Sequence, residues 1–521
     1  MTADIYRHKN GLKHINIVNS DCFSALFVVN TPIFDNSGVA HAVEHMVFRG
    51  STTFPQPETL FQLTSLTDAK INASTFAETT YFHCQSQCYH TFMLAINYLL
   101  NGLFNPIFDT DDLLCEIHDG NDKGVIYQEL IGSEQANKES SESSVQNNNL
   151  DNKQEDFCYG GTSASIGDLS LDDLTAFHQR FYHASNITLV TANANIEQIS
   201  HLVSLLPKQP NPSKQIPIDV DKHRKQSQDH TQKNTQENAQ ENAQENESSG
   251  HQKKYPPAIN KLITHYNLWL NDPYYQEIED YKNIESSNKP LVINTNTLPV
   301  LPQSNLISPL VTLSNRLIND AINDKSINIG IKDIGIKDIG IKKSAHKTLL
   351  PNLFTQLYQQ AKKHLSINKS NSHKLNNNEL DHHRTQACAS DQHNALWLTN
   401  IDATEQTLAT IASYIISAYP KFLVPRCQGF CYATQALTIE NSAYLTIYSA
   451  FDVNPDTRLK EVPLCLLSLS QDKRFISMSL ALAKIKYCQA YNVDNKQVMN
   501  ITSNAISAYL QVLANSCHPK V

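Results

Sequence analysis

The sequence has no dense cluster of lysine and arginine, and its formal net charge is -9 over 521 residues. A protein that binds nucleic acid needs clustered basic groups to contact the phosphates, so nucleic acid is not an expected partner. The sequence also has no apolar run long enough to span a membrane, and its first residues lack the apolar core of a secretory signal. We therefore expect a cytoplasmic protein without a membrane partner.

Paired Cys-x-x-Cys frames, which would indicate a structural zinc site, are also missing. The eleven cysteines are an odd number with scattered spacing, and neither Cys84 with Cys88 nor Cys427 with Cys431 forms such a frame. Reduced thiols in a cytosol are the simpler account of this cysteine usage.

Changes in composition predict the domain organisation. Only 40% of the residues are hydrophobic, and several stretches are almost entirely polar, so the folded part is smaller than the length implies. We predict a first domain with a polar insertion, a disordered linker with a Gln-Glu-Asn-Ala repeat, a reduced middle region with an Ile-Gly-Ile-Lys-Asp repeat, and a C-terminal domain. The first domain is residues 1–205, with the polar insertion at 138–155. The linker is 206–255, the reduced middle region is 256–345 and the C-terminal domain is 346–521.

Strands alternate with amphipathic helices in both predicted domains, which indicates an α+β fold class. In the first domain we expect two strands within residues 14–31, further strands at 70–76, 80–84 and 187–192, and helices at 38–50, 57–66, 89–103, 124–132 and 169–181. Asn36 or Ser37 is the expected N-cap of the helix at 38–50. In the C-terminal domain we expect strands at 395–399, 430–438 and 443–451, and helices at 405–419, 477–490 and 495–514.

The stretch from Gly38 to Gly50 contains His41, Glu44 and His45. On a helix, two histidines four residues apart project from one face, so their imidazoles can bind one metal ion. Glu44 can then reach a water molecule on that ion and take its proton. The order His-x-x-Glu-His is that of the inverzincin zinc peptidases, although an amphipathic helix with two exposed histidines would show the same pattern.

A catalytic zinc ion has three protein ligands and keeps a fourth position for water, so the two histidines need a third ligand. Glu129 is the candidate, because it lies in the apolar, helix-compatible segment Gly124–Gly132 near the end of the same domain. A structural zinc site would need a fourth protein ligand, and the sequence offers none near this trio.

With these residues the sequence resembles the pitrilysin/insulinase family of zinc peptidases, most closely its presequence-protease-like branch. The resemblance implies insulinase-like α/β sandwich domains and extends over nearly all of residues 7–200 in the order of the family. The residues that carry it are Asn36–His45, Phe48–Ser51, Ile71–Thr75 with Thr80 and Tyr81, Gly124–Leu130, Tyr159–Ile166 and Phe177–Asn186.

The resemblance implies that His41, His45 and Glu129 bind one zinc ion and that Glu44 is the general base. The family often carries a second acidic residue seven positions before the ligand glutamate, and here Asp122 stands at that place. A carboxylate there can orient a metal ligand by hydrogen bonding.

The strand with the family's Asn-Ala pair, here Asn72 and Ala73, lies along the cleft as a sheet edge in that family. A peptide can add to such an edge as an extra strand through main-chain hydrogen bonds. Asn72 and Ala73 are therefore candidate substrate-binding residues, and the alternative is that Asn72 is an ordinary turn residue.

A second resemblance lies near the C-terminus, in Arg426–Ala433 and Ile447–Asp456. It is similar to the family's distal arginine and tyrosine, which reach the bound substrate and its developing oxyanion. Arg426 and Tyr432 have the six-residue offset of the presequence-protease-like branch, but Phe430 and Cys431 replace small residues of the motif. The alternative is an ordinary arginine and a core tyrosine.

From these features we expect a zinc-dependent metalloendopeptidase that hydrolyses short, unstructured peptides with a zinc-bound water activated by Glu44. The alternative is a non-catalytic or crippled family member that binds peptides or a partner chain. Members of the presequence-protease-like branch are longer and have related domains in two halves that close as a clamshell. This chain resembles their first and last domains. Either a homodimer or a partner chain closes the chamber, or the protein is a decaying copy with weak activity.

Overall fold

The computed structural model divides the chain into two compact units, residues 1–215 with 283–521 and residues 216–282. The second unit lies outside the described part of the chain, as do the predicted linker beyond residue 206 and the predicted middle region at 256–345. The predicted domain boundaries therefore stay predictions. The described residues are 2–18, 22–121, 123–142, 158–206, 386–390, 393–438, 444–493, 497–498 and 500–517.

A six-stranded sheet with the order β1-β2-β6-β3-β5-β4 organises the N-terminal part of the chain. Only β2 and β6 pair in parallel, and the other neighbours are antiparallel. Strand β3 has an almost wholly buried apolar sequence and lies inside the sheet, whereas β4 forms one edge. The strands are β1 (Thr2–Arg7), β2 (Lys13–Val18), β3 (Phe23–Asn30), β4 (Lys70–Thr75), β5 (Thr79–Ser86) and β6 (Ile187–Ala192).

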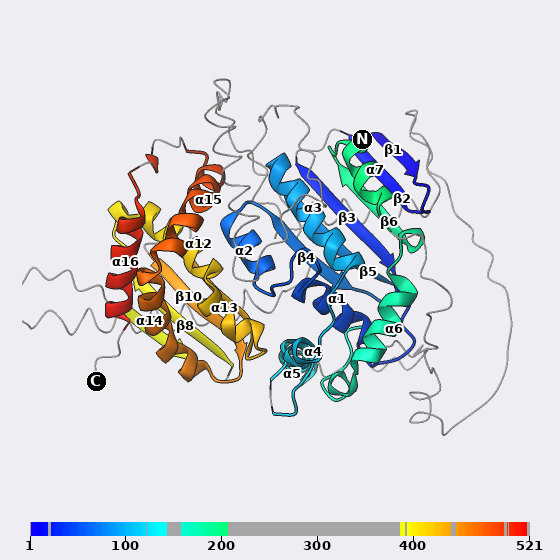
Figure 1. Ribbon diagram of the computed structural model, residues 1–521. Coiled ribbons are helices and arrows are strands. Elements are labelled where there is room, and N and C mark those ends of the chain that lie inside the picture. Colours follow the sequence, from blue (N-terminus) through cyan, green and yellow to red (C-terminus); the bar gives the residue numbers. More distant parts are fainter. Residues whose placement is uncertain are drawn as a thin grey trace, which may run out of the picture. The chain divides into compact units, whose positions relative to one another are not determined.

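Helices cover this sheet, and Figure 1 shows α3 lying along strands β3 and β5. Almost every side chain of α3 is buried, as its apolar sequence predicts, and α1 packs against α3, α4 and α6. These contacts fix the helix that carries the histidine motif. The helices are α1 (Val39–Arg49), α2 (Thr59–Leu66), α3 (Tyr89–Phe104), α4 (Thr110–Glu116), α5 (Val125–Glu142), α6 (Leu171–Phe181) and α7 (Ile196–Ser204).

The C-terminal part contains an antiparallel sheet of four strands with the order β7-β8-β10-β9. Its strands are β7 (Gln386–Ser390), β8 (Asn394–Asn400), β9 (Cys431–Thr438) and β10 (Tyr444–Asp452). Its helices are α12 (Gln406–Ala418), α13 (Pro420–Cys427), α14 (Pro455–Gln471), α15 (Lys473–Tyr491) and α16 (Ser503–Ser516). No single helix within the described residues is both long and apolar enough to cross a membrane, although the bent pair Ala403–Ala418 and Pro420–Cys427 passes that test when taken together.

The N-terminal and C-terminal parts contact each other through helix α2, which packs against α12 and α15. The ammonium group of Lys486 donates to the carbonyl oxygens of Thr64 at 2.8 Å and Ser65 at 3.1 Å. These carbonyls belong to the last turn of α2, where a cation also interacts favourably with the helix dipole.

The α+β fold class is confirmed, and each strand and helix predicted for these residues is present. Two helices differ clearly in their bounds, because α5 continues to Glu142 and α16 begins only at Ser503. Six elements were not predicted: β1, α4, α7, β7, α13 and α14. The prolines Pro425 and Pro463 lie inside α13 and α14, and an internal proline argues against a helix. Strand β7 lies in a stretch where no strand was predicted, and it pairs with β8.

Mild acid is expected to destabilise this fold through His178, whose ring is buried against Tyr182 and donates to the carbonyl oxygen of Leu103 at 2.9 Å. Burial lowers the pKa of His178 from 6.5 to about 4. Between pH 6.5 and pH 4 the unfolded chain therefore binds more protons at His178 than the folded chain does. The free energy of unfolding has its full value above pH 6.5 and falls as the pH is lowered through this range.

At pH 5 the loss is about 2 kcal/mol for this one ring. Denaturant titrations at pH 7 and pH 5 measure it if the wild type is compared with His178→Gln, which has no titrating ring. From pH 7 to pH 5 the free energy of unfolding should fall in both proteins, and the fall should be about 2 kcal/mol smaller in the variant than in the wild type. An equal fall in both proteins would show that His178 is not buried as a neutral ring.

Candidate metal centre

Helix α1 begins at a close contact between two glycine backbones. Its N-cap is Gly38, with φ 78°, and not Asn36 or Ser37 as predicted. A Cβ atom on Gly38 would lie 2.9 Å from the Cα atom of Gly161, which also has a positive φ. A side chain at the cap would therefore prevent this approach, which brings the carbonyl oxygen of Gly160 to 3.0 Å from His41 Nδ1.

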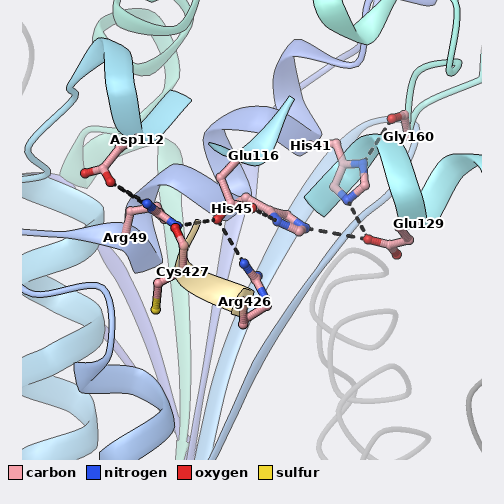
Figure 2. A network of polar contacts seen from close by, with 9 residues as sticks. All are labelled: His41, His45, Arg49, Asp112, Glu116, Glu129, Gly160, Arg426 and Cys427. Carbon is pink, nitrogen blue, oxygen red and sulfur yellow. Dashed lines mark hydrogen bonds and ion pairs between the residues drawn. The ribbon is translucent and has the colours of Figure 1, made fainter. Parts of the chain in front are cut away.

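The two histidines of α1 are held in defined orientations from outside the helix. His41 Nδ1 contacts the carbonyl oxygen of Gly160, and His45 Nδ1 lies 2.9 Å from a carboxylate oxygen of Glu116. Both partners can only accept a hydrogen bond, so each Nδ1 must carry the proton. In the neutral rings the Nε2 atoms therefore have the lone pairs that a metal ion needs, and both point toward Glu129 (Figure 2).

Glu129, on α5, lies where a third ligand is required. Its Oε2 atom is 3.7 Å from His41 Nε2 and 3.8 Å from His45 Nε2, and ligand atoms of the three residues all lie within 4.8 Å of one another. Two ligands of a tetrahedral zinc ion are about 3.4 Å apart when each bond is about 2.1 Å.

The same Oε2 atom of Glu129 is buried and has no hydrogen-bond partner among the residues that the structure describes. A buried carboxylate oxygen without a donor is costly, and a cation between it and the two imidazoles removes that cost. The trio of one carboxylate and two imidazoles is also a ligand set that zinc accepts. The residues present therefore fit a zinc ion.

Glu44 lies on the same helix, with only 7% of its surface exposed. The hydroxyl of Thr75, at the end of edge strand β4, donates to its Oε2 atom at 2.5 Å. Burial raises the pKa of Glu44, while His41 and His45 act in the opposite direction. Glu44 thus stands beside the three ligand residues as a carboxylate that favours taking a proton.

Glu116, on α4, was not predicted as a site residue. Its side chain is 1% exposed, and its Oε2 atom accepts the hydrogen bond from His45 Nδ1. Its Oε1 atom accepts from Arg49 Nη1 and Arg426 Nη1, both at 3.1 Å (Figure 2). Burial alone would raise the pKa of Glu116, but Arg426 and His45 hold it well below its ordinary range.

Glu116 thus makes the kind of contact with a histidine that was predicted for Asp122. Asp122 lies outside the described part of the chain, so its predicted role stays a prediction. No motif surrounds Glu116 in the sequence. Its position in an acidic seven-residue helix resembles an exposed helix end, and only its contacts with α1 reveal its role.

Arg426 and Tyr432 lie on different elements. Arg426 is near the end of α13, and its guanidinium lies over the ring of Phe61 and binds Glu116. Tyr432 is half-buried on β9, and its ring packs edge-on against Phe451. In this structure Arg426 contacts Glu116, and the predicted substrate roles of Arg426 and Tyr432 stay predictions.

Asn72 and Ala73 lie within edge strand β4, so Asn72 is not a turn residue. The Asn72 side chain accepts from the backbone N–H of Ala73 at 2.9 Å, and the Ser74 hydroxyl donates to the Ala73 carbonyl at 2.7 Å. Two neighbouring side chains thus bind the main-chain groups of Ala73, as an added strand would.

Gly38→Ala is expected to lower the free energy of unfolding by about 2 kcal/mol, because it adds a steric clash to an unfavourable φ. Gly120 is a matched control, since its φ is 88° but nothing lies within 4 Å of its Cβ position. Denaturant titration should show a smaller loss for Gly120→Ala. Equal losses in the two variants would contradict the close contact between Gly38 and Gly161.

Comparisons with known proteins are consistent with this geometry. Residues 34–151 match the family described as Insulinase (Peptidase family M16). The mitochondrial presequence protease of Kluyveromyces lactis is 28% identical over 213 residues, which are 36% of this chain and 20% of that protein. The mitochondrial presequence protease of Candida albicans is 28% identical over 217 residues, 37% of this chain and 20% of that protein. The chain thus spans about a fifth of the length of these relatives.

Two solved structures also show similarity to this chain. A mutant of the ferredoxin protease FusC in complex with Arabidopsis ferredoxin has 21% identity and a TM-score of 0.32, over 40% of this chain and 25% of that one. A peptidase M16 inactive domain from Pseudomonas fluorescens has 10% identity and a TM-score of 0.30, over 98% of this chain and 95% of that one. Neither score is high enough to support a functional argument.

Proposed function

We propose that this chain, which belongs to the insulinase family of peptidases and is similar to the presequence-protease-like branch, is a zinc-dependent endopeptidase. The observation that carries the proposal is the convergence of His41 Nε2, His45 Nε2 and the buried, unpartnered Oε2 atom of Glu129. The Nδ1 atom of each imidazole is already hydrogen-bonded, so both Nε2 atoms and the Oε2 atom of Glu129 are placed to bind a cation.

A zinc ion held by these residues would polarise the scissile carbonyl group and activate a water molecule. Glu44 would take the proton of that water, since it lies beside the ligands and its burial favours the protonated form. It would then deliver the proton to the leaving amine. Thr75 would hold the Glu44 carboxylate in place during both transfers.

We further propose that the substrate is an extended peptide that adds to β4. The edge position of β4 and the engagement of the Ala73 main chain by Asn72 and Ser74 support this binding mode. A peptide strand would replace those two local hydrogen bonds with main-chain bonds and would pass Thr75, which contacts Glu44. Short, unstructured peptides can bind in this way, whereas the backbone of a folded protein is already paired.

The test is hydrolysis of an internally quenched peptide by the purified chain. We expect hydrolysis to stop when a chelator removes the metal, and to return when zinc is added. A folded protein that contains the same peptide sequence in a strand should stay intact. Zinc-independent hydrolysis, or hydrolysis of the folded protein at the same rate, would contradict the proposal.

A non-catalytic role in binding peptides is the second candidate, and the observation in its favour is that the chain spans only about a fifth of its relatives' length. The same experiment distinguishes the two. Tight zinc and peptide binding without hydrolysis would indicate the binding role. Closure of the site by a second copy or by a partner chain stays a prediction, which measurement of the oligomeric state with bound peptide would test.

A further inference from the structure

The carboxylate of Glu116 connects the predicted zinc ligand His45 to the C-terminal part of the chain. One oxygen accepts from His45 Nδ1, and the other accepts from two guanidinium groups. Arg49 comes from α1 itself, whereas Arg426 comes from α13, which is 310 residues away from Glu116 in the sequence. Both oxygens of a fully buried carboxylate are therefore fixed, and one of the groups that fix it is not part of the N-terminal sheet domain.

The end of α13 and the turn after it also contact α1 and the residue before α5. The carbonyl oxygen of Cys427 accepts from Arg49 Nη1 at 2.7 Å. The carbonyl oxygen of Gly429 accepts from the backbone N–H of Gly124 at 2.9 Å, and Gly124 directly precedes α5, the helix of Glu129. Residues 426–429 thus contact Glu116 and the start of the helix that carries the third ligand.

Gly429 makes this close approach possible. Its φ is 77°, and a Cβ atom there would lie 2.4 Å from the carbonyl oxygen of Cys115, the residue before Glu116. A side chain at position 429 would push the turn away from α4. The arginine at 426 reaches Glu116 only because the turn lies against this backbone.

The contacts of Arg426 differ from those of a residue that binds substrate. Its side chain is 13% exposed, and it packs over the ring of Phe61 while Nη1 binds Glu116 Oε1. A partner that fixes a carboxylate also fixes the hydrogen bond that the carboxylate accepts from the imidazole, and therefore the direction of the Nε2 lone pair. Arg426 is in a position to act on the metal through Glu116 and His45.

We propose that Arg426 is a positioning residue through which the C-terminal part of the chain sets the affinity of the metal centre for zinc. The inference rests on the proposed function, because it takes His45 as a zinc ligand. It implies that the N-terminal domain alone has an incompletely oriented site and that docking of residues 426–429 completes it.

The experiment measures zinc affinity of the full chain by competition with a chromophoric chelator. We expect Arg426→Met to weaken zinc binding by about tenfold or more, the usual effect of removing an outer-shell partner. Arg426→Lys should give an intermediate affinity, because it keeps the charge but not the planar fork. Gly429→Ala removes no polar group, and it should weaken zinc binding in the same direction as Arg426→Met.

Two matched controls separate this effect from general damage. Arg458 is another buried arginine of the C-terminal part, 11% exposed, and its Nε atom donates to Asp452 at 2.9 Å. Arg458→Met should leave zinc affinity within about twofold of the wild type, since Arg458 has no described contact with Glu116 or the ligand residues. Gly120→Ala is the corresponding control for Gly429→Ala. Gly120 also has a positive φ, but nothing lies within 4 Å of its Cβ position.

Two further measurements distinguish a positioning role from contact with substrate. The visible absorption spectrum of the cobalt-substituted protein should change in Arg426→Met, because the spectrum reports ligand geometry. At saturating zinc, the KM for a peptide should be unchanged. If Arg426→Met bound zinc as tightly as the wild type and had a raised KM, Arg426 would act on substrate and the inference would be wrong. If the wild type bound no zinc, the proposed function would fail, and the inference with it.

Discussion

Glu44→Gln is expected to lower the kcat of peptide hydrolysis by about a thousandfold and to leave zinc affinity nearly unchanged. A positioned general base contributes on the order of 10² to 10⁴ to a rate, and the amide cannot take a proton from water. The amide has almost the same size and shape as the carboxylate, and its oxygen can still accept from the Thr75 hydroxyl. Steady-state kinetics of the zinc-loaded variant measure the loss, and chelator competition measures the affinity.

Glu134→Gln is the matched control for this substitution. Glu134 lies on α5, near the third ligand in sequence, but its oxygens accept from the backbone N–H and the hydroxyl of Ser163 at 2.9 Å and 2.8 Å. The kcat of Glu134→Gln should stay within a factor of about two of the wild-type kcat, since Glu134 has no part in the proton transfer. Full activity of Glu44→Gln would exclude Glu44 as the base and would leave the metal site without its proposed chemistry.

Glu129→Gln is expected to weaken zinc binding by about a hundredfold or more and to abolish hydrolysis at micromolar zinc. A neutral amide oxygen is a poor replacement for a carboxylate ligand, and the two imidazoles alone do not complete a catalytic site. The stability of the metal-free protein should not fall. The Oε2 atom of Glu129 has no hydrogen bond to lose among the described residues, and the substitution removes a charge from that buried position.

Thermal unfolding with and without zinc measures both effects. Zinc should raise the Tm of the wild type by mass action, because the folded protein binds the ion through a preformed trio, and it should not raise the Tm of Glu129→Gln. In the metal-free state the two proteins should unfold at similar temperatures. A variant that is still stabilised by zinc as strongly as the wild type would show that the third ligand is a different residue.

The local part of the site could be predicted from the sequence. His41, Glu44 and His45 lie on one helix, and a helix places residues three and four positions apart on one face whatever surrounds it. Glu129 could be proposed because its segment is apolar and helix-compatible, and the structure brings its carboxylate to the two Nε2 atoms. The strand of Asn72 was predicted from its β-type sequence, and its edge position was implied by the resemblance to the family.

The contacts that orient these residues could not be predicted, because they depend on how distant segments pack. Glu116 reaches His45 from a short acidic helix, and Gly160 reaches His41 through a close contact of two glycine backbones. The helix cap was predicted wrongly for the same reason. Gly38 is at the cap because Gly161 lies against it, and side-chain capping preferences do not contain that information.

The contact of Arg426 with Glu116 also depends on packing of segments far apart in the sequence. The resemblance predicts a contact between this arginine and substrate, and the structure shows a contact with Glu116 that the sequence did not predict. An arginine can bind either a substrate or a buried carboxylate, and residue type does not distinguish the two. Only the path of the chain after α13, with Gly429 against Cys115, places it on Glu116.

The most direct test of the zinc-peptidase account is a titration of metal-free protein with zinc while hydrolysis of a quenched peptide is followed. The account predicts that activity rises in proportion to bound zinc and reaches a plateau at one ion per chain. It also predicts that Glu44→Gln binds the same single ion and has almost no activity. Binding of one zinc ion by the wild type without any hydrolysis, across a set of unstructured peptides, would contradict it.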